Sequence, residues 1–236
     1  MPDPLLSVSH LYAGYGDLIV VRDVSFDVER GSVTLMLGLN GAGKTTTLKT
    51  IMGVLPAKGG RIVFEGRDVT RLPPHERARL GMAMITDNPV FPDMSVADNI
   101  RLAAEASGRR AGGDPVSEAV KYFPDLGRFL GVKASALSGG QRKMLAVAMA
   151  MVSRPKLLLL DEPSTGLSPV MVSRVVDYVA QLKSMGITVL LAEQNPSFIA
   201  VADYVVVLEM GKVRLAGPAG EVGRLEEVRK SFFQVA

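Results

Sequence analysis

The sequence predicts an α/β fold built on a largely parallel sheet, with a helical subdomain inserted into it. Short apolar runs rich in β-branched residues alternate with helical patterns along most of the 236 residues, which is typical of layered α/β proteins. The stretch from Ser95 to Val152 differs, because it contains no β-rich run and glycines and prolines interrupt its helical pattern. We therefore predict one domain, with an α/β core at residues 1–94 and 153–236 and a helical subdomain at residues 95–152.

Strand, turn and helix patterns follow one another through the first part of the core. The continuous apolar run Val33–Leu37 suits a strand that is buried on both faces, and a glycine-rich turn comes directly after it. In chain order we predict strands at Leu5–Tyr12, Val20–Val28, Val33–Leu37 and Arg61–Glu65, a helix near Lys44–Val54, a turn leading into a short helix over Asp68–Gly81, and a strand near Met84.

The core pattern resumes after the helical stretch. A run of leucines predicts one more buried strand, and the segment Met210–Lys212 is typical of a tight hairpin turn. We predict strands at Lys156–Asp161, Ile187–Ala192, Tyr204–Glu209 and Val213–Ala216, a helix near Val170–Met185, and an amphipathic helix over Glu221–Phe233.

The composition excludes several classes of protein and site. The chain has no cysteine, which rules out disulfides and thiolate metal sites, and its two histidines, His10 and His75, argue against a poly-histidine metal site. No apolar run approaches the ~20 residues of a membrane-spanning helix. The N-terminus lacks the basic and apolar regions of a secretory signal. The net charge of +3 is too small to indicate a nucleic-acid-binding protein.

A glycine-rich segment between a predicted strand and a predicted helix fits the phosphate-binding P-loop pattern G-x-x-x-x-G-K-[ST]. Its glycines let backbone N–H groups turn toward phosphate oxygens, and the positive end of the following helix favours an anion. In that pattern Lys44 reaches the β- and γ-phosphates, and the Thr45 hydroxyl binds Mg²⁺. The alternative is an ordinary glycine-rich turn. The segment consists of Gly38, Leu39, Asn40, Gly41, Ala42, Gly43, Lys44 and Thr45.

Two carboxylates end the leucine-rich strand predicted at Lys156–Asp161. In open α/β sheets, ligands bind at the carboxyl ends of the strands. Asp161 therefore fits the acidic residue that holds Mg²⁺, and Glu162 fits a base that polarises the water attacking the γ-phosphate. The alternative, which would be favoured without the P-loop, is a solvated acidic pair at the end of a strand.

The segment Leu137–Gln141 predicts a second helix start that could face an anion. Ser138 is a natural N-cap, and the two glycines after it leave backbone N–H groups free at the positive end of a helix. By itself this segment is an ordinary helix start. Its position between the P-loop and the Asp161-Glu162 strand makes it more specific.

In this order, the P-loop, the Leu-Ser-Gly-Gly-Gln segment and the strand ending in Asp-Glu resemble the ATP-binding cassette (ABC) family. The resemblance covers nearly the whole chain. It implies a P-loop NTPase fold, with an ABC-type core of mostly parallel sheet, an antiparallel β part at the N-terminus and an inserted helical subdomain. In that family two ATPase domains enclose two ATP molecules, and each nucleotide touches the P-loop of one chain and the second segment of the other. The residues implied to bind the partner's γ-phosphate are Ser138, Gly139, Gly140 and Gln141.

Other segments match the family position by position. Tyr15 stands where the family places an aromatic ring that stacks on adenine, the alternative being a tyrosine in the core or in a turn. Thr46, directly after the P-loop, belongs to the implied nucleotide contacts. Pro163–Leu167 resembles the loop that meets the partner chain, and Ser95–Ile100 resembles the entry to the helical subdomain. The implied cofactors are ATP and Mg²⁺.

Three positions depart from the family pattern. Asp87 stands where the family has a glutamine that touches Mg²⁺ and leads toward the transmembrane partner, so Asp87 is a candidate Mg²⁺ ligand. Ser168 replaces the usual aspartate after the loop leucine. Gln194 replaces a histidine that contacts the γ-phosphate, and its amide can hydrogen-bond a phosphate but cannot become a cation. These departures bear on the hydrolysis rate more than on nucleotide binding.

The departures, together with short segments elsewhere, resemble the ATPase subunits of bacterial branched-chain amino acid importers, and among them the LivF type. The resemblance implies a peripheral protein on the cytoplasmic face of the inner or plasma membrane. The implied partners are a second ABC ATPase chain, identical or different, transmembrane permease subunits and a solute-binding protein, with no nucleic acid. Other subunits recognise the solute, so we expect no solute pocket in this chain.

Several alternatives stay open at this stage. Close relatives of the importer ATPases carry urea or other amides, and an exporter is the next candidate among transporters. Gln194 and Asp87 also allow a regulatory cassette that holds ATP but barely hydrolyses it. A soluble ABC protein acting on DNA or ribosomes is disfavoured, because those chains usually carry two cassettes or long coiled-coil insertions.

Overall fold

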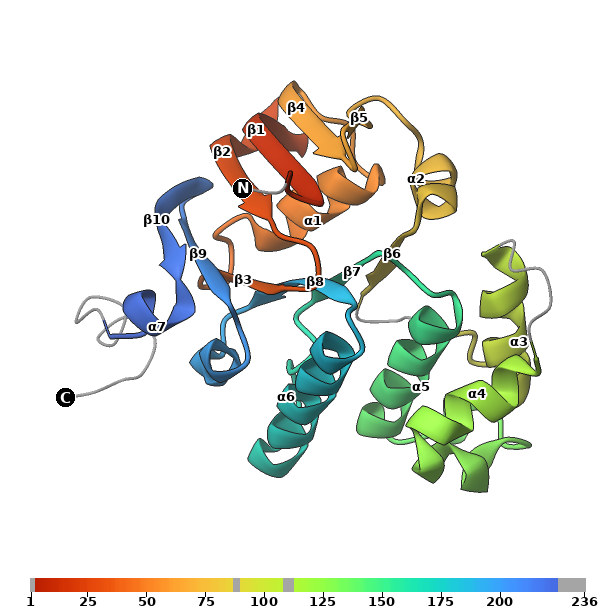
Figure 1. The fold of residues 1–236 in the computed structure, drawn as a ribbon. Helices are drawn as coiled ribbons and strands as arrows, with labels where there is room; N and C mark the ends of the chain where they lie inside the picture. The colour runs from red at the N-terminus through yellow and green to blue at the C-terminus, as the bar shows by residue number, and fades with distance from the viewer. Residues whose placement is uncertain (1–2, 87–89, 108–112, 225–236) are drawn as a thin grey trace.

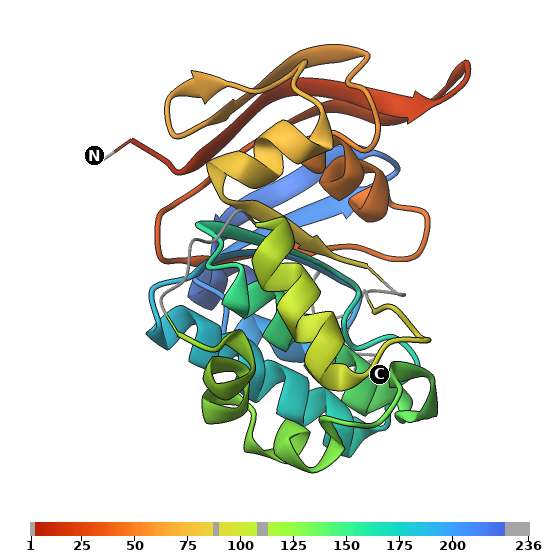
Figure 2. The ribbon, with the colours of Figure 1, turned by 90° about the vertical axis from the view of Figure 1, so that its right-hand side faces the viewer.

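The computed structural model describes residues 3–86, 90–107 and 113–224, and it places two sheets one above the other (Figures 1 and 2). The larger sheet has six strands in the order β10-β9-β3-β8-β7-β6. Its strands are β3 (Val33–Leu37), β6 (Met82–Ile85), β7 (Leu157–Asp161), β8 (Thr188–Glu193), β9 (Tyr204–Glu209) and β10 (Lys212–Pro218).

All neighbouring strands of the larger sheet run parallel except the β9–β10 pair, which is the predicted hairpin. Every residue of β3 and β8 is buried, because layers of the protein cover both faces of the sheet. This burial explains the continuous apolar runs that predicted these strands. In the register, Leu37 lies opposite Glu193, and Asp161 lies opposite Ala192. The ends of β3, β8 and β7 therefore meet at one edge.

The smaller sheet is antiparallel and has the order β2-β1-β4-β5. Its strands are β1 (Leu6–Tyr15), β2 (Leu18–Val28), β4 (Gly59–Phe64) and β5 (Arg67–Asp68). Helix α1 (Lys44–Met52) lies between the two sheets (Figure 1), and its Leu48 and Ile51 belong to the apolar core that both sheets share. This arrangement confirms the antiparallel N-terminal part, and it holds α1 rigidly directly after β3.

Helix α2 (Pro74–Leu80) fixes the far end of α1 through one buried side chain. The Arg77 guanidinium donates hydrogen bonds to the carbonyl oxygens of Thr50 and Ile51, at 2.8 and 2.6 Å, and to those of Leu72 and Thr70. A cation at the carboxyl end of a helix complements the helix dipole and satisfies its last carbonyls. The orientation of α1 is therefore fixed at both ends of the helix.

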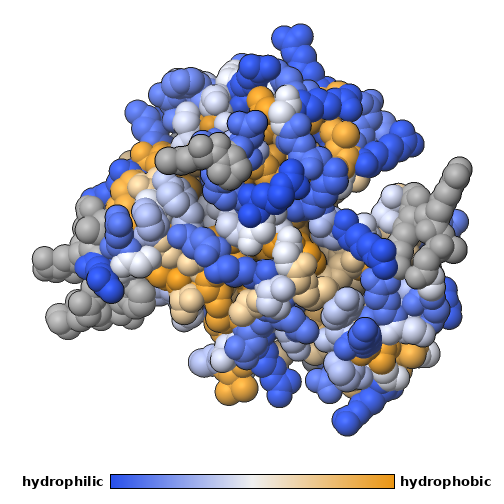
Figure 3. Space-filling view, viewed as in Figure 1, coloured by the Kyte–Doolittle hydropathy of each residue, from blue (hydrophilic) through white to orange (hydrophobic). Residues whose placement is uncertain are grey.

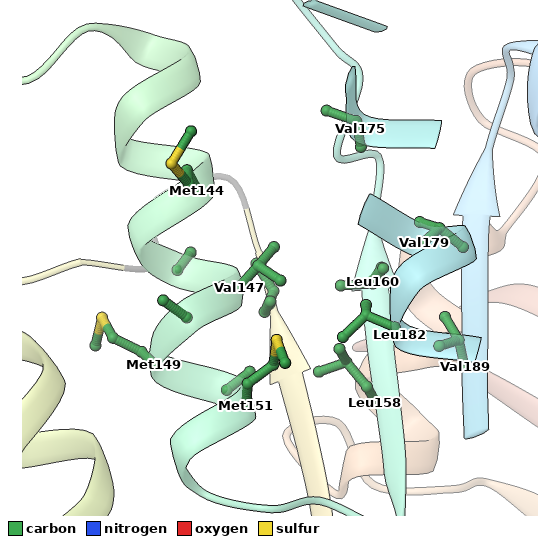
Figure 4. Packing of buried hydrophobic residues seen from close by; sticks show 14 of the residues in the cluster. Met144, Val147, Met149, Met151, Leu158, Leu160, Val175, Val179, Leu182 and Val189 are labelled. Atoms are coloured by element: carbon green, nitrogen blue, oxygen red, sulfur yellow. The ribbon is translucent and has the colours of Figure 1, made fainter. Parts of the chain in front are cut away.

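The remaining helices lie on the other face of the larger sheet. Figure 4 shows apolar side chains of α5 and α6 facing those of β7, with Met144, Val147, Leu160 and Val179 among them. The helices are α3 (Val96–Ala106), α4 (Pro115–Tyr122), α5 (Gly139–Val152), α6 (Pro169–Ser184) and α7 (Ala219–Val222), with short 3₁₀ turns at Pro124–Phe129, Ala134–Ala136 and Pro196–Ala200.

Helices α3, α4 and α5 pack on one another at one side of the molecule (Figure 1), where the sequence predicts the helical subdomain. The division at residues 95–152 itself stays a prediction. Strands β3 and β9 have the predicted ends, and the other predicted strands and helices of the core before residue 219 are present with shifted ends. Strand β5 and the 3₁₀ turns were not predicted. The predicted helix over 221–233 is described only at its start. There α7 begins at Ala219 and ends at Val222, and the residues from 225 onward lie outside the described part.

The surface is mostly hydrophilic on the face shown in Figure 3, with apolar side chains showing through near the middle of the molecule. Within the described residues, no helix has the length and apolar character needed to cross a lipid bilayer.

Candidate functional site

The candidate site lies at the edge where β3, β7 and β8 end. The glycine-rich loop 38–43 follows β3, Glu162 follows β7, and Gln194 follows β8. The Gly38 N–H donates to the Glu193 carbonyl at 3.1 Å, and the Glu162 N–H donates to the Ala192 carbonyl at 2.9 Å. The backbone of β8, which lies between β3 and β7, therefore holds both neighbouring loops in register.

The loop after β3 leaves the N-terminus of α1 open. Gly43 occupies the N-cap position with φ 104°, which is the left-handed region, and no side chain caps the helix. At Gly38, a Cβ atom would lie 2.8 Å from the Leu208 carbonyl oxygen, so a larger residue would push the loop away from β9. The first turn of α1 contains no acidic residue. The uncapped N–H groups and the helix dipole together suit an anion such as phosphate.

Lys44 is folded back over this loop. Its side chain is 3% exposed, and Nζ donates to the carbonyl oxygens of Gly38 and Leu39 at 2.8 and 3.1 Å. The same Nζ lies 3.0 Å from Oε1 of Glu162, whose side chain is 21% exposed. A buried ammonium requires such partners. The ammonium therefore lies between the loop that suits a phosphate and the carboxylate that follows β7.

Thr45 and Asp161 meet across the same edge. The Thr45 hydroxyl donates to Oδ1 of Asp161 at 2.9 Å, which joins the start of α1 to the end of β7. A hydroxyl and a carboxylate are oxygen donors of the kind that Mg²⁺ prefers, and Mg²⁺ commonly takes one or two such protein ligands beside phosphate oxygens. Among the described residues, no group of three or more histidine, cysteine, aspartate or glutamate side chains is placed to hold a metal ion.

Glu162 is held in a strained conformation. Its φ is 47°, in the left-handed region that non-glycine residues rarely adopt, and strain of this kind often marks functional positions. Besides the contact with Lys44, Oε2 accepts a hydrogen bond from the Thr165 hydroxyl at 3.2 Å. The carboxylate is thus aimed toward the P-loop and kept partly open to water.

The Leu137–Gln141 segment begins α5 and does not join the P-loop in this chain. Ser138 is the N-cap, as predicted. Its Oγ accepts from the Gln141 N–H at 3.3 Å, while the Gln141 side-chain oxygen accepts from the Ser138 N–H at 2.8 Å. Ser138 and Gly139 are exposed. Among the hydrogen bonds of the described residues, none links this segment to residues 38–45.

Lys143, one turn into α5, connects this helix to the loop that follows β7. Its Nζ donates to the Thr165 carbonyl at 2.9 Å, and Thr165 also contacts Glu162. A Cβ at Gly140 would lie 2.4 Å from the terminal methyl of Met171 on α6. A larger residue at position 140 would therefore have to displace the flexible end of the Met171 side chain.

Tyr15 lies at the end of β1 and is 48% exposed, which excludes the core alternative and leaves the turn and adenine-stacking alternatives. The β1–β2 hairpin that carries it lies beside the P-loop: a Cβ at Gly43 would come within 3.6 Å of Val21 on β2. Gln194 is exposed at the end of β8. Asp87 lies outside the described residues.

Sequence reasoning missed Glu193, which is fully buried at the last position of β8. Its Oε1 accepts from the Ser164 N–H at 2.8 Å, and Oε2 accepts from the N–H groups of Gln194 and Asn195 at 3.1 and 3.3 Å. The available signal was a charged residue directly after a buried apolar run. Its contact with residue 164 could not be predicted from the sequence.

Comparisons with known proteins identify chains that are similar in sequence and in fold. A family model described as ABC transporter matches residues 21–165. The probable branched-chain amino acid transport ATP-binding protein LivF of Archaeoglobus fulgidus is 37% identical over 96% of this chain and 97% of its own. The lipopolysaccharide export system ATP-binding protein LptB of Acidithiobacillus ferridurans is 36% identical over 92% of each chain. A solved ATP-binding cassette of an ABC transporter in its ADP conformation has a TM-score of 0.84 at 27% identity, over 99% of this chain and 100% of that one.

Proposed function

This chain belongs to the ABC transporter family and is an ATPase subunit of a transporter, and we propose that this transporter imports branched-chain amino acids or related solutes. The similarity to a LivF protein and the sequence Glu193-Gln194-Asn195 support the proposal. The solute itself binds to other subunits. The permeases and a solute-binding protein therefore complete the transporter, and this chain works at the cytoplasmic face of the membrane.

The observation that carries the chemistry is the pair of contacts Lys44–Glu162 and Thr45–Asp161 at one edge of the sheet. The γ-phosphate of ATP lies at the N-terminus of α1, where it gives the Lys44 ammonium a second anionic partner. Thr45 and Asp161 would hold Mg²⁺, with Asp87 as a further candidate ligand. When bound, Mg²⁺ supplies positive charge that offsets the negative charge on the phosphate oxygens.

Glu162 acts as the general base. Its carboxylate accepts a proton from a water molecule as the water oxygen attacks the γ-phosphorus and the bond to the bridging oxygen of ADP breaks. Lys44 stabilises the charge on the γ-phosphoryl group by hydrogen bonding. The products are ADP and inorganic phosphate. The Gln194 amide donates a hydrogen bond to the same phosphate, and the Tyr15 ring stacks on adenine.

A second ATPase chain completes each site. The residues proposed to contact the γ-phosphate held by the partner are Ser138, Gly139, Gly140 and Gln141. The exposure of Ser138 and Gly139 at the start of α5 supports this contact. The LivF resemblance favours a partner that differs from this chain. ATP-driven closure of the pair moves the helical subdomain at residues 95–152.

The surface around residues 87–95 transmits this movement to the permeases. The buried Asn99 side chain fixes the backbone of residues 91–95 in this surface. It accepts from the Phe91 N–H at 2.7 Å and donates to the carbonyls of Phe91 and Ser95 at 3.0 and 2.9 Å. Phe91 is 51% exposed, and its backbone is held by Asn99. An exposed aromatic side chain on a fixed loop suits a protein interface.

Gentle affinity purification from the native membrane, followed by mass spectrometry, tests the transporter assignment. We expect two permeases and a second, different ATPase. The reconstituted complex is then assayed for ATP hydrolysis with its binding protein and either leucine, isoleucine, valine or urea. Stimulation by the three amino acids supports the proposal. Stimulation by urea alone indicates an amide importer, and recovery of ribosomal proteins without permeases refutes a transport role.

An exporter is the second candidate, because the LptB protein is nearly as similar in sequence as the LivF protein. The same purification separates the two, since an exporter would be recovered without a solute-binding protein that stimulates hydrolysis. A regulatory cassette would instead show tight ATP binding with little turnover in the complete complex.

A further inference from the structure

Glu193 is a buried carboxylate that the mechanism above does not use. It is 0% exposed, and its carboxylate accepts hydrogen bonds from three backbone N–H groups. Within the part of the chain that the structure describes, no lysine, arginine or histidine forms an ion pair with it. Burying a carboxylate is unfavourable unless such donors compensate it. A neutral apolar residue could fill the end of the strand without the free-energy cost of burying a carboxylate. We therefore look for the role of this carboxylate in the loops whose N–H groups it accepts from.

Glu193 contacts all three loops of the active edge. Its backbone carbonyl accepts from Gly38, the first residue of the P-loop. Oε1 accepts from Ser164, in the loop that also carries Thr165, and Thr165 contacts Glu162. Oε2 accepts from Gln194 and Asn195, at the start of the loop after β8. One residue therefore fixes the relative positions of the base, the glutamine and the phosphate loop.

We propose that Glu193 is a positioning residue for ATP hydrolysis: its carboxylate holds the loop after β7 to the loop after β8, and so sets Glu162 and Gln194 relative to the γ-phosphate. The proposal rests on the proposed roles of Glu162 and Gln194. ATP binding depends on the P-loop, which Glu193 holds only through its backbone. Loss of the carboxylate therefore slows hydrolysis and leaves ATP affinity unchanged.

The test is Glu193→Gln in the full-length chain. The amide has nearly the same size but only one acceptor oxygen, and its NH₂ group faces N–H donors, so at least one loop loses its partner. We expect kcat to fall roughly ten- to a hundredfold, since misplacing a catalytic group by about 1 Å has effects of that size. The Kd for ATP should stay within about twofold, which assigns the loss to the chemical step.

Asp203→Asn is the matched control. The Asp203 carboxylate also accepts from a backbone N–H, that of Val33 at 2.9 Å, and from Lys183, but at the opposite edge of the sheet, where β3 begins. Its variant should lose thermal stability without a fall in kcat. Hydrogen exchange at the Ser164, Gln194 and Asn195 amides gives a second readout, and Glu193→Gln should speed exchange at one loop or both.

The outcomes separate this inference from the proposed function. Unchanged kcat in folded Glu193→Gln overturns the positioning role, and so does a parallel fall in kcat, ATP affinity and stability, which indicates a structural role. If Glu193→Gln does not fold, Glu193→Asp retains the charge but shortens the side chain, and the same criteria apply to it. Glu162→Gln is measured alongside. If Glu162→Gln keeps full turnover, the assignment of Glu162 as the general base is wrong. If Glu162→Gln loses turnover while Glu193→Gln stays fully active, only the positioning role of Glu193 is refuted.

Discussion

Helices α1 and α5 both begin at glycine-rich segments, but only the N-terminus of α5 is capped by a side chain. α1 begins after Gly43 with no side-chain cap, and its first residue, Lys44, is buried. α5 begins after Ser138 with a reciprocal capping box, and its first residue, Gly139, is exposed. The N–H groups of α1 are left for a ligand held inside this chain. The start of α5 is already capped within one chain and leaves Gly139 exposed, which suits the proposed contact with a partner.

The largest effect should come from Glu162→Gln, which removes the proposed proton acceptor of the α1 site but keeps its shape. We expect ATP to bind and turnover to fall by about a hundredfold or more, because a positioned general base contributes that much. Single-turnover hydrolysis beside ATP titration measures both quantities. Turnover within a few-fold of the wild type would remove Glu162 from its role and leave α1 as a binding site only.

Lys44→Ala should weaken the binding of ATP at the α1 site. Loss of a charge-assisted hydrogen bond to phosphate costs roughly 1.5–3 kcal/mol, or about ten- to a hundredfold in ATP affinity. Isothermal titration with ATP gives the measurement. The control is Lys49→Ala on the last turn of the same helix. Equal affinity in the Lys44 variant and the wild type would sink the P-loop assignment.

Thr45→Val tests a second difference between the two helix starts, namely the proposed Mg²⁺ contact at the start of α1. The substitution preserves the branched shape and removes the hydroxyl that donates to Asp161 at 2.9 Å. We expect hydrolysis to need a several-fold higher Mg²⁺ concentration, and Thr45→Ser, which restores the hydroxyl, to recover the original dependence. A Mg²⁺ titration of the ATPase rate checks this. An unaltered Mg²⁺ requirement would place the metal elsewhere.

Ser138→Ala should have the smallest effect on the isolated chain. Losing an N-cap costs about 1 kcal/mol of unfolding free energy, which urea unfolding measures. ATP affinity of the isolated chain should not change, because the start of α5 makes no hydrogen bond to residues 38–45 of its own chain in the described structure. Turnover of the paired ATPases should fall. The control is Asp114→Ala, since the Asp114 side chain caps α4 by accepting from the N–H groups of Val116 and Ser117. If both variants reduce turnover equally, the start of α5 has no special contact with the partner's nucleotide.

The core strands, the P-loop and the start of α5 could be predicted from the sequence because they depend on local patterns. Val33–Leu37 is apolar throughout because both faces of β3 are covered, and Ser138 caps a helix using residues three positions apart. Strand ends were less accurate: β1 and β2 extend toward their shared turn, where Tyr15 pairs with Leu18 in the hairpin. Cross-strand pairing, not side-chain pattern, sets those ends.

The sequence alone determined the ATPase chemistry, because the P-loop and the carboxylates after a leucine-rich strand are local motifs with definite spacing. Only the tertiary structure decided how these motifs meet. The order β3-β8-β7 brings residues 44 and 162 to within 3.0 Å, and it places the buried Glu193 between the loops that follow. Such contacts join residues far apart in the chain. They depend on strand order and register, which no single segment of the sequence specifies.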